Sequence, residues 1–90
     1  MNVDWDPGKA RANRVKHGVS FPDAEAVLFD PNGITREDTD AEGEPRYVTL
    51  GLDTLGRVLV VVYTHRGDTI RIISARKATR NEVRTYERRI

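Results

Sequence analysis

Two groups of basic and titratable residues stand near opposite ends of this 90-residue chain. In the first, Lys9 and Lys16 are seven residues apart, so they share one face of a helix, and His17 follows directly. Lysines can hold a phosphate, and a histidine can accept or donate a proton near neutral pH. A plain helix end is the alternative, because a cationic histidine before Gly18 is favoured by the helix dipole.

The second group lies near the C-terminus and combines arginines with one glutamate and one tyrosine. Its members are Arg71, Arg76, Arg80, Glu82, Arg84 and Tyr86. The planar guanidinium fork of arginine matches two phosphate oxygens. Glu82 could act as an acid or base, and Tyr86 could stack on a base or donate a proton. Their structural alternatives are a capping-box partner for Thr79 and a core side chain.

Other kinds of site are excluded by residue type or spacing. With no cysteine, the chain has no disulfide, thiol nucleophile or cysteine-based zinc site. His17 and His65 lack the spacing of a helical metal pair, and Asp38 and Asp40 fall in an expected loop. No Gly-rich nucleotide loop or Gly-x-Ser-x-Gly elbow occurs. We therefore expect no metal and no cofactor.

The net charge of +1 conceals an uneven distribution. Residues 1–22 carry four basic and two acidic side chains. Residues 23–44 carry one basic and eight acidic side chains, and residues 45–90 carry ten basic and four acidic ones. Taken as a total, the charge argues against a nucleic-acid partner. Taken along the chain, it describes two basic blocks around an acidic one, and a basic block can form a phosphate-binding surface.

Helix caps and hydrophobic periodicity predict the elements that position these groups. We expect an edge strand at 2–5, helices at 6–17, 20–30 and from 79 onward, and strands at 46–52, 57–64 and 69–76. Short turns make the last three strands antiparallel. The order β-α-α-β-β-β-α predicts one α+β domain over residues 1–90, a small antiparallel sheet packed against helices. Residues 31–44 are expected to form a long, exposed acidic loop.

Periodicity also predicts which side chains share a face. Strict alternation in the last strand places Ile70, Ile72 and Ser74 on one side and Arg71, Ile73 and Ala75 on the other. Helical spacing predicts apolar stripes at Phe21, Ala24 and Leu28 and at Val83, Tyr86 and Ile90.

Two separated stretches of the sequence resemble the BrnT toxin family of type II toxin–antitoxin systems. The first comprises Val3-Asp4-Trp5-Asp6, Lys9, Asn13, Lys16-His17-Gly18-Val19-Ser20-Phe21, Ala24 and Ala26. The second runs from Arg71 to Glu82 and continues with Arg84 and Tyr86, and residues 46–51 fit the family's middle strand. The resemblance covers nearly the whole chain outside the acidic loop.

The resemblance implies a RelE-like fold and metal-independent RNA cleavage that blocks translation and arrests growth. It implies a ribbon-helix-helix antitoxin, operator DNA bound through that antitoxin, and an oligomer within the complex. The active surface carried over comprises Lys16, His17, Arg71, Arg76, Glu82 and Tyr86, without fixed acid and base roles. From the clusters themselves we add Lys9, Arg80 and Arg84 as RNA contacts.

Two non-catalytic functions use the same basic surface. It could hold RNA or DNA without cutting it, or it could dock an acidic protein partner. The longest apolar run has six residues, far fewer than the ~20 that span a bilayer, and the first residues do not resemble a signal peptide. We therefore expect a cytoplasmic protein without a membrane partner.

Overall fold

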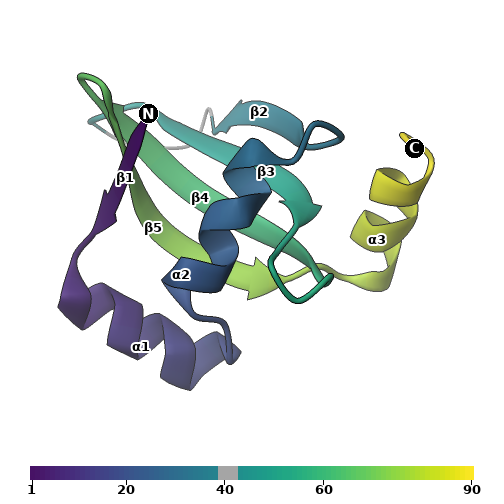
Figure 1. The fold of residues 1–90 in the computed structure, drawn as a ribbon, viewed down its shortest axis with the longest axis horizontal. Coiled ribbons are helices and arrows are strands. Elements are labelled where there is room, and N and C mark those ends of the chain that lie inside the picture. Colours follow the sequence, from purple (N-terminus) through teal and green to yellow (C-terminus); the bar gives the residue numbers. More distant parts are fainter. Residues whose placement is uncertain (39–42) are drawn as a thin grey trace.

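The structure, a computed structural model, describes residues 1–38 and 43–90 and builds them around one five-stranded sheet (Figure 1). The elements are β1 (Asn2–Trp5), α1 (Pro7–His17), α2 (Phe21–Ala24), the 3-10 helix η1 (Glu25–Phe29), β2 (Ile34–Asp38), β3 (Arg46–Leu52), β4 (Val58–Arg66), β5 (Thr69–Lys77) and α3 (Arg80–Glu87). The strand order is β1-β5-β4-β3-β2. The expected α+β class is confirmed.

The sheet is mixed, because β1 pairs with β5 in parallel while the other neighbours are antiparallel. It also has one strand more than expected. β2 lies inside the predicted loop and pairs with β3 from Ile34↔Leu50 to Asp38↔Arg46. An edge strand can be this polar because its pairing with β3, rather than apolar alternation, holds it. The expected loop is therefore wrong for residues 34–38, and its residues 39–42 lie outside the described residues.

The expected helix caps are confirmed at both ends of the chain. The Asp6 side chain accepts a hydrogen bond from the Lys9 amide at 2.9 Å, and Gly18 ends α1 in the left-handed region with φ 69°. Thr79 and Glu82 form the reciprocal capping box that begins α3. These caps fix where the two helices that carry the candidate residues begin and end.

Two apolar stripes differ from the prediction. Phe21 and Ala24 of α2 and Val27 of η1 are fully buried. In η1 the 3-10 geometry has three residues per turn, which places Val27 rather than Leu28 beneath Ala24. Leu28, expected in that stripe, is half-buried. Ile90 was expected to face inward, but α3 ends at Glu87 and Ile90 is exposed.

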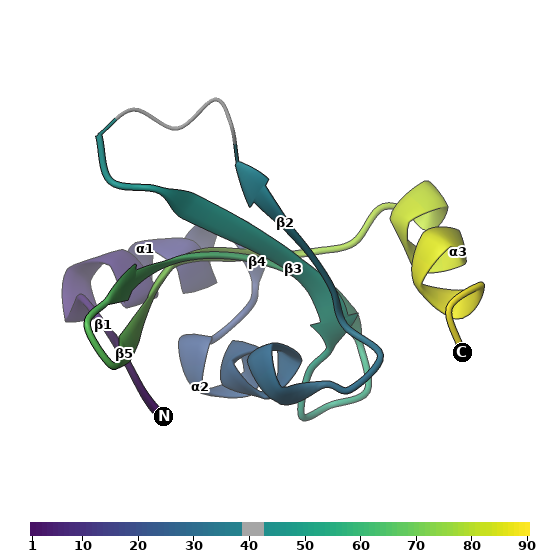
Figure 2. The same ribbon diagram turned by 90° about the horizontal axis from the view of Figure 1, so that it is seen from above.

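The helices cover the sheet unequally (Figures 1 and 2). α2 and η1 cross one face, where the main core lies; α1 runs beside β5, and α3 stands beyond the far end of the sheet. The core comprises Val19, Phe21, Ala24, Val27, Leu59, Val61, Tyr63, Ile70, Ile72 and Ala75. We call the opposite face, which α2 and η1 leave uncovered, the open face. Within the described residues no helix is long and apolar enough to cross a bilayer.

Candidate functional site

β5 contains a register shift that changes which side chains share a face. Val62 pairs with Ser74, but the next residue of β4, Tyr63, pairs with Ile72. Ile73 is therefore left without a partner in the register. Such a β-bulge interrupts the alternation of side chains along the strand.

The bulge brings Arg71 and Arg76 to the same face. These residues are five apart, so strict alternation would place them on opposite faces. After the shift, Ala75 joins the core, whereas Ser74 and Arg76 project with Arg71 from the open face. The predicted grouping of Ser74 with the isoleucines and of Ala75 with Arg71 is therefore wrong.

Every arginine within the strands projects from the open face. Residues paired across strands share a face, and one such row runs Arg36, Val48, Val62 and Ser74. Side chains alternate along a strand, so every second residue of β3 and β4 from this row also lies on the open face. Thr64 is one of these residues, and its partner Arg71 therefore lies on the same face. The strand arginines on this face are Arg36, Arg46, Arg66, Arg71 and Arg76. Arg36, Arg46 and Arg66 were not predicted as site residues, because the sequence of a single strand does not reveal which face of the sheet the helices cover.

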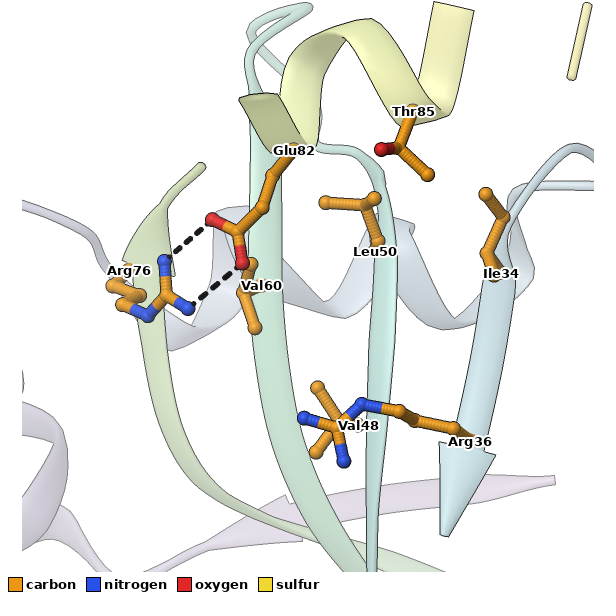
Figure 3. A pocket seen from close by; sticks show the side chains of 8 residues that line it. All are labelled: Ile34, Arg36, Val48, Leu50, Val60, Arg76, Glu82 and Thr85. Atoms are coloured by element: carbon orange, nitrogen blue, oxygen red, sulfur yellow. Dashed lines mark hydrogen bonds and ion pairs between the residues drawn. The ribbon is translucent and has the colours of Figure 1, made fainter. Parts of the chain in front are cut away.

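Arg76 borders a hollow of about 230 Å³ between the open face and α3 (Figure 3). It is lined by Ile34, Arg36, Val48, Leu50, Val60, Arg76, Glu82 and Thr85. Glu82 holds Arg76 there through two hydrogen bonds, from Nη1 to Oε1 at 2.8 Å and from Nη2 to Oε2 at 3.0 Å. This bidentate geometry fixes the guanidinium plane beside the hollow.

The contacts of Glu82 keep it ionised. The hydrogen bonds from Arg76 lower the pKa of Glu82 to about 2, and the hydrogen bond from the Thr79 amide also favours the carboxylate. A carboxylate with so low a pKa is a weak base at neutral pH. The structure thus supports two structural tasks for Glu82, capping α3 and orienting Arg76.

Tyr86 lies in the interior, with 1% of its surface exposed. Its hydroxyl donates to Asp30 Oδ2 at 2.5 Å, and the same oxygen accepts from the Leu52 amide at 2.9 Å. Burial and this hydrogen bond raise the pKa of Tyr86 to about 12. The phenol attaches α3 to the body of the protein and does not reach the open face.

The wild type is expected to lose stability at high pH as the Tyr86 hydroxyl ionises, and Tyr86→Phe is expected to lack this part of the loss. The pKa of Tyr86 in the folded protein is about 12, above the ordinary value of 10.0. The protonated hydroxyl therefore contributes its full share of the free energy of unfolding below pH 10, and this contribution disappears as the pH rises toward 12. Urea unfolding from pH 8 to 12 should show a smaller decline for Tyr86→Phe than for the wild type. Tyr47→Phe is the control, and an equal decline in Tyr86→Phe would contradict the assignment.

Asn13 joins α1 to the open edge of β5. Its Nδ2 donates to the carbonyls of Ala75 at 2.8 Å and Val19 at 3.1 Å, and its Oδ1 accepts from the Ala75 amide at 3.1 Å. β1 pairs only with residues 69–72, so the amide side chain continues the strand edge beyond the end of β1. Asn13 is buried, and the sequence alone did not predict that it attaches α1 to β5.

This attachment brings the first group of candidate residues to β5. Lys9, Lys16 and His17 line a hollow of about 220 Å³ together with Ala12, Asn13, Ile73 and Ser74. Ser74 projects from the open face, as does Arg76 two residues later on β5. Within residues 1–38 and 43–90, the side chains of Lys9, Lys16 and His17 have no ion-pair partner. The first group thus lies beside β5, at Ser74, two residues from Arg76 of the second group.

The remaining candidates, Arg71, Arg80 and Arg84, line neither of the two hollows. Arg71 is on the open face, where Asp4 of β1 pairs with it at 3.4 Å. Arg80 and Arg84 are exposed on α3 and line neither hollow, and Arg84 contacts Asn81 at 3.5 Å.

The fold and this surface define a class of small α+β protein, one with an uncovered, arginine-rich sheet face suited to phosphate groups. Residues 5–82 match the family model described as the ribonuclease toxin BrnT of type II toxin–antitoxin systems. The chain belongs to this family, and the resemblance seen in the sequence is confirmed. A member of such a family has a protein antitoxin as its partner.

A solved structure supports the same assignment. The chain is similar to the crystal structure of the Brucella abortus ribonuclease toxin BrnT, with a TM-score of 0.70 and 26% sequence identity. The match covers 89% of this chain and 99% of that one. No curated protein sequence matches the chain.

Proposed function

We propose that this protein is a metal-independent endoribonuclease toxin that cuts cellular RNA and is neutralised by a ribbon-helix-helix antitoxin. The observation that carries the proposal is the convergence on β5 of the open-face arginines with the lysines and histidine of α1. RNA supplies its own nucleophile, the 2′-hydroxyl. The protein therefore needs proton-transfer groups and cations that stabilise the charge on the reacting phosphate.

The reacting phosphate would lie over β5, between Arg76 and His17. The 2′ oxygen bonds to phosphorus as the bond from phosphorus to the 5′ oxygen breaks, leaving a 2′,3′-cyclic phosphate and a 5′-hydroxyl. His17 accepts the proton of the 2′-hydroxyl, and the Lys16 ammonium donates a proton to the departing oxygen. Arg76, oriented by Glu82, stabilises the phosphate oxygens.

Of the acid and base candidates in the sequence, His17 fits proton transfer best. Glu82 has its two oxygens committed to Arg76 and the cap of α3, and its pKa is about 2. Tyr86 is buried with its hydroxyl on Asp30. His17 is only half-buried and lines the hollow beside Ser74.

Purified protein, free of antitoxin, is expected to cut single-stranded RNA in the presence of EDTA. His17→Ala should lower the rate at least tenfold, because the proton acceptor is lost, whereas Arg11→Ala on another side of α1 should not. Gel analysis of end-labelled RNA checks both variants. Cleavage abolished by EDTA would contradict metal independence, and RNA that is bound but never cut would leave a nucleic-acid-binding module.

Growth provides the test of the antitoxin. Induction of this protein should arrest growth, and co-expression of a neighbouring reading frame with a ribbon-helix-helix pattern should restore it. Arrest that no such neighbour relieves would contradict that part of the proposal.

A further inference from the structure

We propose that the hollow between the open face and α3 is a subsite for one unpaired RNA base. This inference rests on the proposed function and specifies how the substrate is held. The base would belong to a nucleotide that adjoins the phosphate bound over β5, so the hollow would favour single-stranded RNA and influence where it is cut.

The floor of the hollow suits the flat, apolar face of a base. Ile34, Leu50 and Val60 are cross-strand neighbours on β2, β3 and β4. Val48, two residues before Leu50 on the same face of β3, extends this aliphatic surface. The volume of about 230 Å³ corresponds to roughly eight water molecules. A flat base has room in this space.

The rim supplies the groups that a nucleotide needs beside its base. The Arg36 guanidinium extends from β2 across Val48, as Figure 3 shows. Within the described part of the chain Arg36 has no ion-pair partner. A guanidinium plane can stack on a base or bind a phosphate. Arg36 is therefore free to contact an incoming nucleotide.

Arg76 connects the hollow to the phosphate site. It lines the hollow, yet it is only two residues, roughly 6.6 Å along the strand, from Ser74 in the hollow beside α1. A nucleotide has this combination of an apolar base and an adjoining charged phosphate. In a duplex the base faces are covered by stacked neighbours, so only an unpaired base could occupy the floor. An antitoxin side chain could also fill the hollow, but it would lack the adjoining phosphate.

A substitution at Thr85 can fill the hollow while every residue of the sheet, its arginines included, stays unchanged. Thr85 is exposed on α3 and lines the rim, so Thr85→Trp should occupy the space of the base. Asn81→Trp, which adds the same bulk at an exposed position of α3 outside both hollows, is the matched control. The probe is a labelled heptanucleotide containing the linkage that the wild type cuts, 2′-O-methylated at that linkage, with one base removed at each position in turn.

Fluorescence anisotropy should show that removal of one base next to the cut linkage weakens wild-type binding about tenfold, within the range for base stacking. Thr85→Trp should bind the intact probe about tenfold more weakly and should not respond to that base, while Asn81→Trp behaves as the wild type. Equal affinities for all the wild-type probes, or a Thr85→Trp variant that responds like the wild type, would overturn the subsite. So would a Thr85→Trp variant that loses only antitoxin binding.

Failure of the subsite and failure of the proposed function give different results. A protein that cuts RNA but shows equal affinity for every probe remains a ribonuclease without a base subsite. A protein that cuts no RNA fails the proposed function before any probe is designed.

Discussion

Replacement of Arg76 by alanine is expected to lower the rate of RNA cleavage about 10²- to 10³-fold. Arg76 is oriented by a bidentate pair, because both oxygens of Glu82 accept hydrogen bonds from its guanidinium. Removing one preoriented donor to a developing negative charge typically has an effect of this size. The measurement is the cleavage rate at saturating RNA, which separates the chemical step from binding.

Loss of one positive charge must be distinguished from loss of this particular guanidinium. Arg11→Ala removes the same charge from an exposed position on α1 and should cut RNA like the wild type. Arg76→Lys should recover only part of the rate, because an ammonium cannot form the bidentate pair with Glu82. Arg76→Ala that folds normally and retains full activity would remove this residue from the site.

Replacement of Asn13 by alanine is expected to lower the free energy of unfolding by about 3 kcal/mol. Three hydrogen bonds of roughly 1 kcal/mol each are lost, and the Ala75 amide and carbonyl lose their partner beside the core. Urea unfolding monitored by circular dichroism measures the change. Asn2→Ala, at an exposed position, should stay within about 0.5 kcal/mol of the wild type.

Asn13→Ala should also weaken RNA cleavage even at temperatures where the protein remains folded. Asn13 fixes α1 against β5, and Lys9, Lys16 and His17 depend on that attachment for their position. A variant within about 0.5 kcal/mol of the wild type in stability would show that the amide does not hold α1 in place.

Local signals in the sequence were sufficient for much of the fold. Asp6-Pro7, Gly18 and the Thr79 capping box act within a few residues, so their outcome does not depend on distant partners. The run of apolar residues in β4 is long enough to define a central strand. These features gave the α+β class and nearly the whole element order.

The remaining features depend on pairing between distant strands. β2 carries too few apolar residues to be recognised alone, and only its pairing with β3 makes it a strand. The bulge at Ile73 exists because of the register between β4 and β5. Without that register, neither the shared face of Arg71 and Arg76 nor the position of Arg36 beside the hollow could be predicted.

The parallel pairing of β1 with β5 has a consequence for synthesis of the protein. Asp4 meets Arg71, 67 residues later, and Asn13 meets Ala75, 62 residues later. Contacts of such long sequence separation form slowly and require the distant partner to be available. A nascent chain therefore cannot assemble the surface over β5 until residues 69–77 have left the ribosome. In that order of events, the basic surface over β5 does not exist while the ribosome is still making the first part of the chain, up to residue 68.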